Sequence, residues 1–197
     1  MATEEQGRRR RAGRGTSLSR KLSYLLRHDP GALGLTLDEA GWVGVDALLA
    51  ALAVDGTPVS RSALADLVAD SDKQRFALDP VTDQIRAQQG HSVPVALGLT
   101  ARQPPPVLHH GTVARFLPAI SVEGLTRQGR HHVHLSEDEP TARRIAARRG
   151  PPVVLEVAAG AMAADGHEFF LSGNGVWLVD AVPVRYLTSA GDSTPLG

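Results

Sequence analysis

The stretch RFALDPVTDQIRA, residues 75–87, decides the fold of the first half of the chain. Its two short runs, 75–78 and 84–87, flank the turn Asp79-Pro80-Val81-Thr82-Asp83, a pattern typical of a β-hairpin. Leucines 18, 22, 25 and 26 precede it at helical spacing and predict a helix that begins at Ser17 or Ser19. We further expect a short strand at 42–45, a helix that Asp46 caps and that runs to Leu52, and a third helix from Ser60.

Three helices followed by a hairpin predict a winged-helix lobe over residues 17–97. Periodicity is then lost, and Pro104-Pro105-Pro106 ends a predicted linker over residues 98–106. The remainder alternates short apolar runs with helical patterns, and glycine-containing turns separate them. We expect strands at 107–110, 131–135, 153–157 and 176–179, and helices at 113–120 and 140–149. The fold class is therefore α+β, with a second, mostly β lobe over residues 107–190.

Composition limits the possible chemistry. The 197 residues include no cysteine, which excludes disulfides, cysteine nucleophiles and thiolate zinc sites. No apolar run approaches the ~20 residues that span a bilayer, and the N-terminus lacks the apolar stretch of a signal peptide. We expect a soluble, cytoplasmic monomer without membrane contact.

Charge is unevenly distributed although the formal net charge is zero. Residues 1–16 hold five arginines against two glutamates, and we expect this segment to be a disordered arginine-rich tail that either solubilises the chain or steers nucleic acid. The rest of the chain has 16 basic and 19 acidic residues, so it lacks the broad basic surface of a nonspecific nucleic-acid binder. An anion site must therefore be a local arginine cluster.

Arginine stands close to histidine in three segments: Arg27-His28, residues 85–92 and residues 130–135. Arginine offers a planar donor fork that matches phosphate, and histidine titrates near neutrality. We therefore predict that Arg27, His28, Arg86 and Arg130 bind a phosphate and move a proton. Spacing alone equally allows four unrelated surface residues.

Three motifs of the second half could bind a ligand. His110-Gly111-Thr112 is expected after a strand and before a helix, where glycine admits a ligand and helix N–H groups face an anion, but it could be an ordinary turn. His132 and His134 share one strand face and could line a cleft, whereas a metal site lacks the carboxylates to complete it, so we expect no metal. Residues 172–176, SGNGV, form either a β-turn or a ligand-lining loop.

Four arginines recur at helical spacing, at positions 143, 144, 148 and 149. We interpret them as a solvated helix face, with contact to a nucleic-acid backbone as the alternative.

Taken together, the chain resembles the RNA 2′-phosphotransferase family, also called tRNA 2′-phosphotransferase or KptA. The resemblance covers about residues 17–190. The matching stretches are LSRKLS (18–23), LLRH (25–28), IRAQQGHS (85–92), HGT (110–112), GL (124–125), RHHVHL (130–135) and SGNGVW (172–177).

The resemblance implies a winged-helix, RNA-binding lobe followed by an ADP-ribosyltransferase-like lobe that binds NAD. It implies transfer of an internal RNA 2′-phosphate to NAD, with release of nicotinamide and then of ADP-ribose 1″,2″-cyclic phosphate. Its Arg-His-Arg-Arg tetrad falls on Arg27, His28, Arg86 and Arg130. The residues on the NAD side would be His110, Gly111, Thr112, His132, His134, Ser172, Asn174, Gly175 and Val176.

The chain departs from the family pattern at two positions. His109 stands where the family usually has Tyr, which affects the expected packing above the nicotinamide, and Arg20 stands where Lys is common. Two other functions are compatible with the same residues. One is an ADP-ribosyltransferase that caps nucleic-acid ends or proteins without the second step, and the other is a winged-helix binding module with an inactive NAD lobe.

Overall fold

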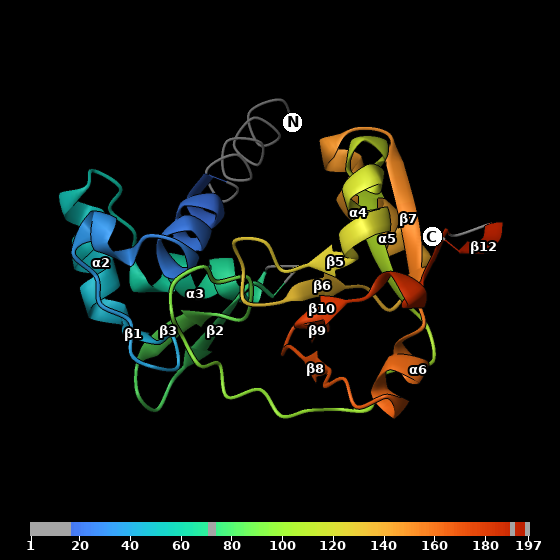
Figure 1. Cartoon of the computed structure of the whole chain (residues 1–197). Helices are drawn as coiled ribbons and strands as arrows, with labels where there is room; N and C mark the ends of the chain where they lie inside the picture. Colours follow the sequence, from blue (N-terminus) through green and yellow to red (C-terminus); the bar gives the residue numbers. More distant parts are fainter. Residues whose placement is uncertain (1–16, 71–73, 190–191, 196–197) are drawn as a thin grey trace. The chain divides into compact units, whose positions relative to one another are not determined.

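A computed structural model describes residues 17–70, 74–189 and 192–195. The chain divides into two compact units, with the boundary between Gly98 and Leu99 (Figure 1). Each unit has its own hydrophobic core and mixes helices with small antiparallel sheets, so the α+β class is confirmed. The predicted tail, residues 1–16, lies outside the described residues.

The first unit contains a helix over residues 17–27, η1 (Pro30–Leu33), β1 (Val43–Gly44), α2 (Val45–Val54), α3 (Arg61–Ala69), β2 (Phe76–Asp79) and β3 (Gln84–Ala87). β3 is the central strand of the sheet β1-β3-β2. The predicted hairpin is present, with Phe76 opposite Ala87 and Leu78 opposite Ile85. Ile85 is fully buried and also faces Val43, so one residue joins the hairpin to β1 and to the core.

Helix boundaries in this unit follow local capping. Asp29 accepts a hydrogen bond from the Ala32 amide at 3.0 Å and so begins η1. The predicted cap at Ser60 is also present, because its side chain accepts from the Ala63 amide. The predicted Asp46 cap is wrong: β1 runs directly into α2, whose cap position is Gly44.

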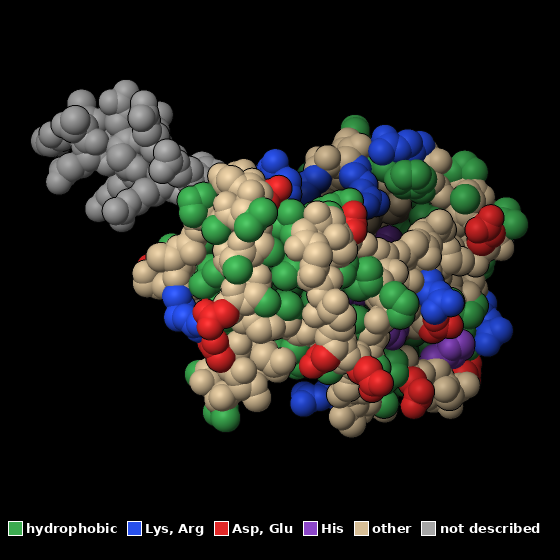
Figure 2. Space-filling view, turned by 90° about the vertical axis from the view of Figure 1, so that its left-hand side faces the viewer, with side chains coloured by type: hydrophobic (Ala, Val, Ile, Leu, Met, Phe, Trp, Pro, Cys, Tyr) green, Lys and Arg blue, Asp and Glu red, His purple; other side chains and the backbone are tan. Residues whose placement is uncertain are grey.

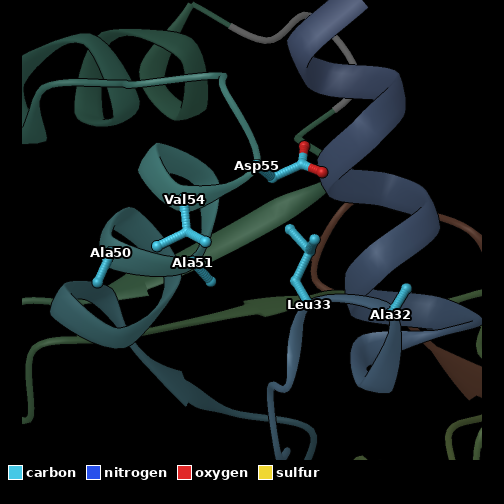
Figure 3. Close-up of a pocket in the computed structure, with 6 residues that line it drawn as sticks. All are labelled: Ala32, Leu33, Ala50, Ala51, Val54 and Asp55. Atoms are coloured by element: carbon cyan, nitrogen blue, oxygen red, sulfur yellow. The ribbon is translucent and has the colours of Figure 1, made fainter.

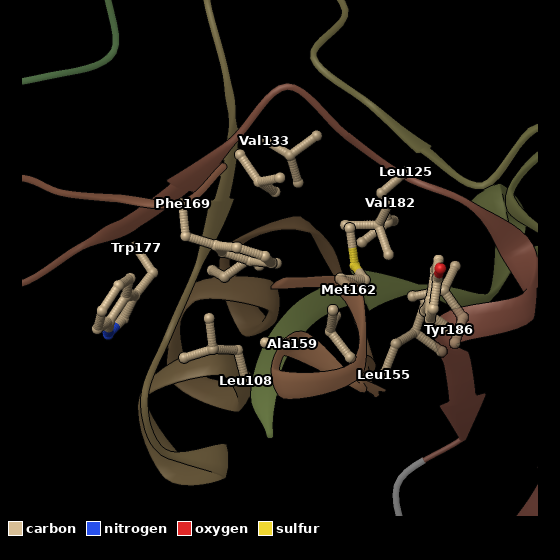
Figure 4. Packing of buried hydrophobic residues seen from close by; sticks show 14 of the residues in the cluster. Leu108, Leu125, Val133, Leu155, Ala159, Met162, Phe169, Trp177, Val182 and Tyr186 are labelled. Carbon is tan, nitrogen blue, oxygen red and sulfur yellow. The ribbon is translucent and has the colours of Figure 1, made fainter. Parts of the chain in front are cut away.

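The second unit contains β4 (Leu108–Val113), η2 (Ala114–Phe116), α4 (Leu117–Glu123), β5 (Leu125–Thr126), β6 (Val133–Leu135), α5 (Glu139–Ala146), η3 (Ala147–Arg149), β7 (Pro152–Val157), α6 (Ala159–Ala164), β8 (Phe170–Leu171), β9 (Trp177–Val179), β10 (Ala181–Val182), η4 (Val184–Tyr186), β11 (Leu187–Ser189) and β12 (Asp192–Pro195). The strands form the sheets β12-β11-β7-β4, β6-β9-β8 and β10-β5. Leu108, Leu155, Met162 and Phe169 are among the buried side chains between them (Figure 4).

Several predicted boundaries of the second half are wrong. β4 continues to Val113, so the helix expected over 113–120 begins at Leu117 after a 3-10 turn. The helix expected over 140–149 ends at Ala146 and continues as η3.

Residues 101–106 belong to the second unit and are hydrogen bonded within it. The Arg102 amide donates to the Phe169 carbonyl at 2.7 Å, and the Gly160 amide donates to the Pro106 carbonyl at 3.0 Å. These bonds attach the proline-rich part of the predicted linker to the second core. Within the described residues, no helix is long and apolar enough to cross a membrane.

Candidate functional site

The C-terminal end of the helix over residues 17–27 carries Arg27, and His28 follows it. Burial of the leucines on one side of this helix fixes its orientation in the first unit. The amides of Ser92 and Val93 donate to the Arg27 carbonyl at 2.8 and 3.3 Å. The His28 Nδ1 atom lies 2.9 Å from the Ser92 hydroxyl. Two distant segments of the sequence therefore meet at Arg27 and His28.

Gly90 lies against the guanidinium of Arg27. Its φ is +86°, in the region that favours glycine, and a Cβ at this position would lie 3.6 Å from Arg27 Nη1. The neighbouring His91 is almost fully buried, with 1% of its surface exposed. The stretch IRAQQGHS thus folds back on Arg27 after β3 ends.

Arg86 projects from β3 and is half-buried. Its Cζ lies 4.6 Å from the centre of the Trp42 ring, and its Nη1 donates to the carbonyl of Ala40 at 3.2 Å and to that of Leu97 at 3.5 Å. Among the described residues, no carboxylate forms an ion pair with Arg86. Its positive charge is therefore not neutralised by a neighbouring side chain.

Arg130, His134 and His110 form a connected set in the second unit. Arg130 Nη1 lies 3.5 Å from His134 Nδ1, and since arginine only donates, His134 accepts here. His110 Nδ1 lies 3.1 Å from the His134 carbonyl oxygen, so this nitrogen carries the proton.

Burial lowers the pKa of His110 from 6.5, although its hydrogen bond to His134 opposes the shift, and the charges of Arg149 and Arg130 lower the pKa further. The lowered pKa keeps His110 neutral at pH 7, with Nδ1 as a donor and Nε2 as an acceptor. Burial also lowers the pKa of His132. The His132 ring packs edge-on against the Phe170 ring, with 5.6 Å between the ring centres. β6 begins at Val133, so His132 precedes the strand that was expected to hold both histidines.

The motif His110-Gly111-Thr112 lies inside β4 and not at its end, so the predicted strand-to-helix position is wrong. A Cβ on Gly111 would lie 2.0 Å from the Ala142 carbonyl oxygen of α5. Glycine is therefore required here for the close packing of α5 on β4. Thr112 is also buried, with 5% of its surface exposed.

Residues 172–176 form a tight turn between β8 and β9. The Ser172 side chain is 2% exposed, and its Oγ lies 2.7 Å from Asn174 Oδ1 and accepts from the Val176 amide at 3.0 Å. The Gly175 amide donates to the Ser172 carbonyl at 2.9 Å, with φ of +75° at Gly175. Ser172 therefore holds the turn together from the inside, which leaves Gly173 and Gly175 exposed.

Two tryptophans were not among the predicted site residues. Trp42 packs on Arg86, as described above. Trp177 follows the 172–176 turn and lies at the edge of the second core (Figure 4). Its Nε1 is buried and has no hydrogen-bond partner among the described residues. In the sequence, only its position directly after the SGNGV motif indicates Trp177 as a site residue.

The structure thus connects Arg27 and His28 with residues 90–93 in the first unit, and Arg130 with His134 and His110 in the second. That these two sets form one site stays a prediction.

On the face drawn in Figure 2, the described acidic and basic side chains are interspersed, without a continuous basic surface. Among the described residues, no three potential ligands of the His, Cys, Asp or Glu type are grouped to hold a metal ion.

A surface pocket of about 520 Å³ in the first unit contains none of the predicted site residues. It lies between η1 and α2, and its lining is mainly aliphatic (Figure 3). The lining residues are Ala32, Leu33, Ala50, Ala51, Val54 and Asp55. Asp55, the charged residue of this lining, forms an ion pair with Lys21.

Comparison with known proteins gives a consistent result. The family model described as RNA 2′-phosphotransferase, Tpt1/KptA family, matches residues 13–181. A Streptomyces coelicolor protein named "probable RNA 2′-phosphotransferase" is 55% identical over 174 residues, which cover 88% of this chain and 94% of that protein. A protein of the same name from Agrobacterium fabrum is 52% identical over 179 residues, covering 91% and 96%. Another from Trichormus variabilis is 49% identical over 174 residues, covering 88% and 96%.

Proposed function

Since the chain belongs to the RNA 2′-phosphotransferase family, we propose that it removes an internal 2′-phosphate from RNA and transfers it to NAD. The observation that carries this proposal is the extent of the match. Residues 13–181 include every predicted catalytic and NAD-binding position, from Arg27 to Val176. The family is one of transferases, and its members at about half identity carry that name.

We assign RNA binding to the first unit and NAD binding to the second. The order of three helices and a hairpin supports a winged-helix lobe for the first unit. The small antiparallel sheets with side helices support an ADP-ribosyltransferase-like lobe for the second. Residues 98–106 connect them in this assignment, and the arginine-rich tail precedes the RNA-binding lobe.

In the first step, an oxygen of the RNA 2′-phosphate forms a bond to C1″ of the nicotinamide ribose. The glycosidic C–N bond breaks, and nicotinamide leaves with its electron pair. Arg27, Arg86 and Arg130 would hold the doubly charged phosphate in line for this attack, because arginine forks match phosphate oxygens without a metal.

In the second step, the 2″-hydroxyl oxygen attacks the transferred phosphorus, and the bond from phosphorus to the RNA 2′-oxygen breaks. The hydroxyl proton ends on the RNA 2′-oxygen, and ADP-ribose 1″,2″-cyclic phosphate is released. Negative charge increases on the phosphoryl oxygens, which the arginines stabilise. His28 would carry the proton between the two oxygens, with its ring held by Ser92.

The residues of the second unit fit a bound dinucleotide. His110 is neutral and offers an acceptor at Nε2, and the buried Nε1 of Trp177 is a donor that lacks a partner among the described residues. A buried donor of this kind is commonly satisfied by a ligand or a water molecule. NAD supplies the electrophilic ribose carbon, and His132, His134 and the 172–176 turn would line its site.

The test is to incubate the purified chain with NAD and an RNA that carries one internal 2′-phosphate. We expect stoichiometric loss of the 2′-phosphate, release of nicotinamide and formation of the cyclic phosphate product. Release of nicotinamide with a stable ADP-ribosylated RNA would instead support the transferase that stops after the first step. An RNA with a 2′-hydroxyl is the control and should not react.

A further inference from the structure

Arg86 lies in a cradle formed by a separate loop of the first unit. Residues 38–42 place the Trp42 ring against its guanidinium, at 4.6 Å from Cζ, and the Ala40 carbonyl at 3.2 Å from Nη1. The Leu97 carbonyl adds a second acceptor for the same nitrogen at 3.5 Å. The ring therefore limits the position of the guanidinium, and the carbonyls define the direction of Nη1.

The loop itself is firmly held. The Asp38 carboxylate accepts from the amides of Ala40 and Trp42 at 2.9 and 2.8 Å, and the Asp38 amide donates to the Trp42 carbonyl at 2.9 Å. The Ala96 amide donates to the Glu39 carbonyl at 2.6 Å. These bonds fix the backbone of Trp42 before any ligand binds.

Gly41 of the loop lies against the segment after β3. Its φ is +81°, and a Cβ there would lie 3.5 Å from His91 Nε2 and 3.6 Å from a Val95 methyl carbon. Because His91 is buried, the loop and the IRAQQGHS segment share one interior. Movement of the loop would therefore disturb this interior as well as Arg86.

The cradle uses only part of the guanidinium. Nη1 donates to carbonyls and Nε is buried without a hydrogen bond, whereas Nη2 forms no hydrogen bond within the described part of the chain. No carboxylate in that part pairs with Arg86 either. A cation that an aromatic ring holds in place, without a carboxylate partner, keeps its full charge for an anionic ligand.

We propose that Trp42 is a positioning residue for Arg86, holding its guanidinium so that the Nη2 edge meets the RNA 2′-phosphate. This inference rests on the proposed function, which makes Arg86 a phosphate ligand. Preorganisation of this kind increases affinity because the side chain loses little rotamer freedom on binding. Trp42 acts only through Arg86 and touches no reacting atom.

The test measures binding of two short RNAs, identical except for an internal 2′-phosphate in one and a 2′-hydroxyl in the other. Dissociation constants are determined by fluorescence anisotropy for wild type, Trp42→Leu, Trp42→Phe, Arg86→Gln and the Trp42→Leu/Arg86→Gln double variant. The thermal unfolding midpoint of each variant is measured in parallel. Arg75→Gln, directly before β2, is the matched arginine control.

Loss of the cation–π contact in Trp42→Leu should weaken binding of the phosphorylated RNA by about 5- to 30-fold. Trp42→Phe, which keeps a π face, should weaken it by less than about threefold. Binding of the 2′-hydroxyl RNA should not change. In the Arg86→Gln background, Trp42→Leu should cause no further loss.

Two results would show that Trp42 only supports the fold and would overturn the inference. In one, Trp42→Leu weakens the binding of both RNAs equally. In the other, Trp42→Leu weakens the binding of the phosphorylated RNA as much in the Arg86→Gln background as in the wild type. If Trp42→Leu does not fold, Trp42→Phe decides the question. A loss of affinity for the phosphorylated RNA in Trp42→Phe as large as that in Arg86→Gln would also contradict the inference. A wild type that binds both RNAs equally would overturn the proposed function and this inference with it. A wild type that discriminates, combined with an unaffected Trp42→Leu, would overturn the inference alone.

Discussion

The imidazole Nδ1 of His28 lies 2.9 Å from the hydroxyl oxygen of Ser92, a residue 64 positions further along the chain. The backbone supports this contact, because the Ser92 amide donates to the Arg27 carbonyl at 2.8 Å. A hydrogen bond at Nδ1 fixes the ring orientation and the nitrogen that remains for proton transfer. Ser92 is therefore expected to control how His28 presents its ring.

Ser92→Ala removes this side-chain contact and leaves the backbone bond to Arg27 intact. We expect the second step to slow by about tenfold, and His28→Ala to slow it by about 10²-fold or more, since general acid–base catalysis contributes on this scale. Single-turnover decay of the ADP-ribosylated RNA measures this rate. Ser62→Ala, at an exposed position on α3, should leave it unchanged. An unaltered rate in Ser92→Ala would contradict a role for Ser92 in orienting His28.

Arg86→Ala should reduce turnover of the 2′-phosphorylated RNA by about 10²- to 10³-fold, because it removes a charged donor from the developing phosphate charge. Arg144→Ala is the comparison, since Arg144 is exposed on α5 and contacts the Thr141 hydroxyl at 3.2 Å. We expect less than about twofold loss there, because exposed contacts contribute little. Equal losses in steady-state assays would remove Arg86 from the site.

The first half of the fold could be predicted because its signals are local. The two short runs that flank the turn at residues 79–83 predict the hairpin, and Ser60 marks a helix start by a bond to an amide three residues later. Asp46 carries the same kind of signal, but the chain enters α2 directly from β1. Its carboxylate instead pairs with Arg61, a tertiary contact that no local pattern indicates.

The second half could be predicted less well because its strands are short and pair across long sequence distances. β8 and β10 have only two residues each, too few for a periodic pattern. Gly111 illustrates the same limit for the site. The sequence indicates a glycine next to a ligand, whereas the backbone of α5 occupies the position of its missing side chain. Only the packing of α5 on β4 distinguishes these two reasons for glycine.

Residue chemistry and a family resemblance indicate the site residues, but neither shows spatial contacts. Arg130 donates to the His134 ring and His110 donates to the His134 carbonyl, and these bonds join three of the named residues. The sequence does not distinguish Trp42 from a core residue, because a tryptophan beside a predicted strand usually packs in the core. Its stacking on Arg86 depends on the pairing of β1 with β3, which no local pattern defines.

The reaction should proceed in the presence of EDTA. Three arginines can balance the charge of a phosphate monoester and its transition state without a divalent cation. We expect the rate of 2′-phosphate loss with EDTA in excess over trace metals to equal the rate in buffer. Inhibition that one divalent cation reverses would contradict this expectation.

Gly111→Ala should destabilise the second unit. The added Cβ would lie 2.0 Å from the Ala142 carbonyl oxygen and 3.1 Å from the Ala146 Cβ, so α5 must move away from β4. Overpacking of this kind costs about 1–3 kcal/mol or more in free energy of unfolding. Gly129→Ala is the control, because nothing lies within 4 Å of its added Cβ. Denaturant unfolding of both variants measures the difference, and equal stabilities would contradict the close packing described for α5.

His110 makes the stability of the chain depend on pH. Burial lowers its pKa in the folded state, so between the folded pKa and 6.5 the unfolded chain binds a proton that the folded chain does not. The free energy of unfolding should therefore be highest above about pH 6.5 and decrease as the pH falls toward the folded pKa. His110→Asn keeps a donor for the His134 carbonyl but cannot titrate, so its stability should fall less between about pH 7 and 5. The pKa of His132 is also lowered, which leaves a residual slope in the variant. Parallel profiles for wild type and His110→Asn, from urea unfolding at each pH, would show that His110 titrates alike in both states.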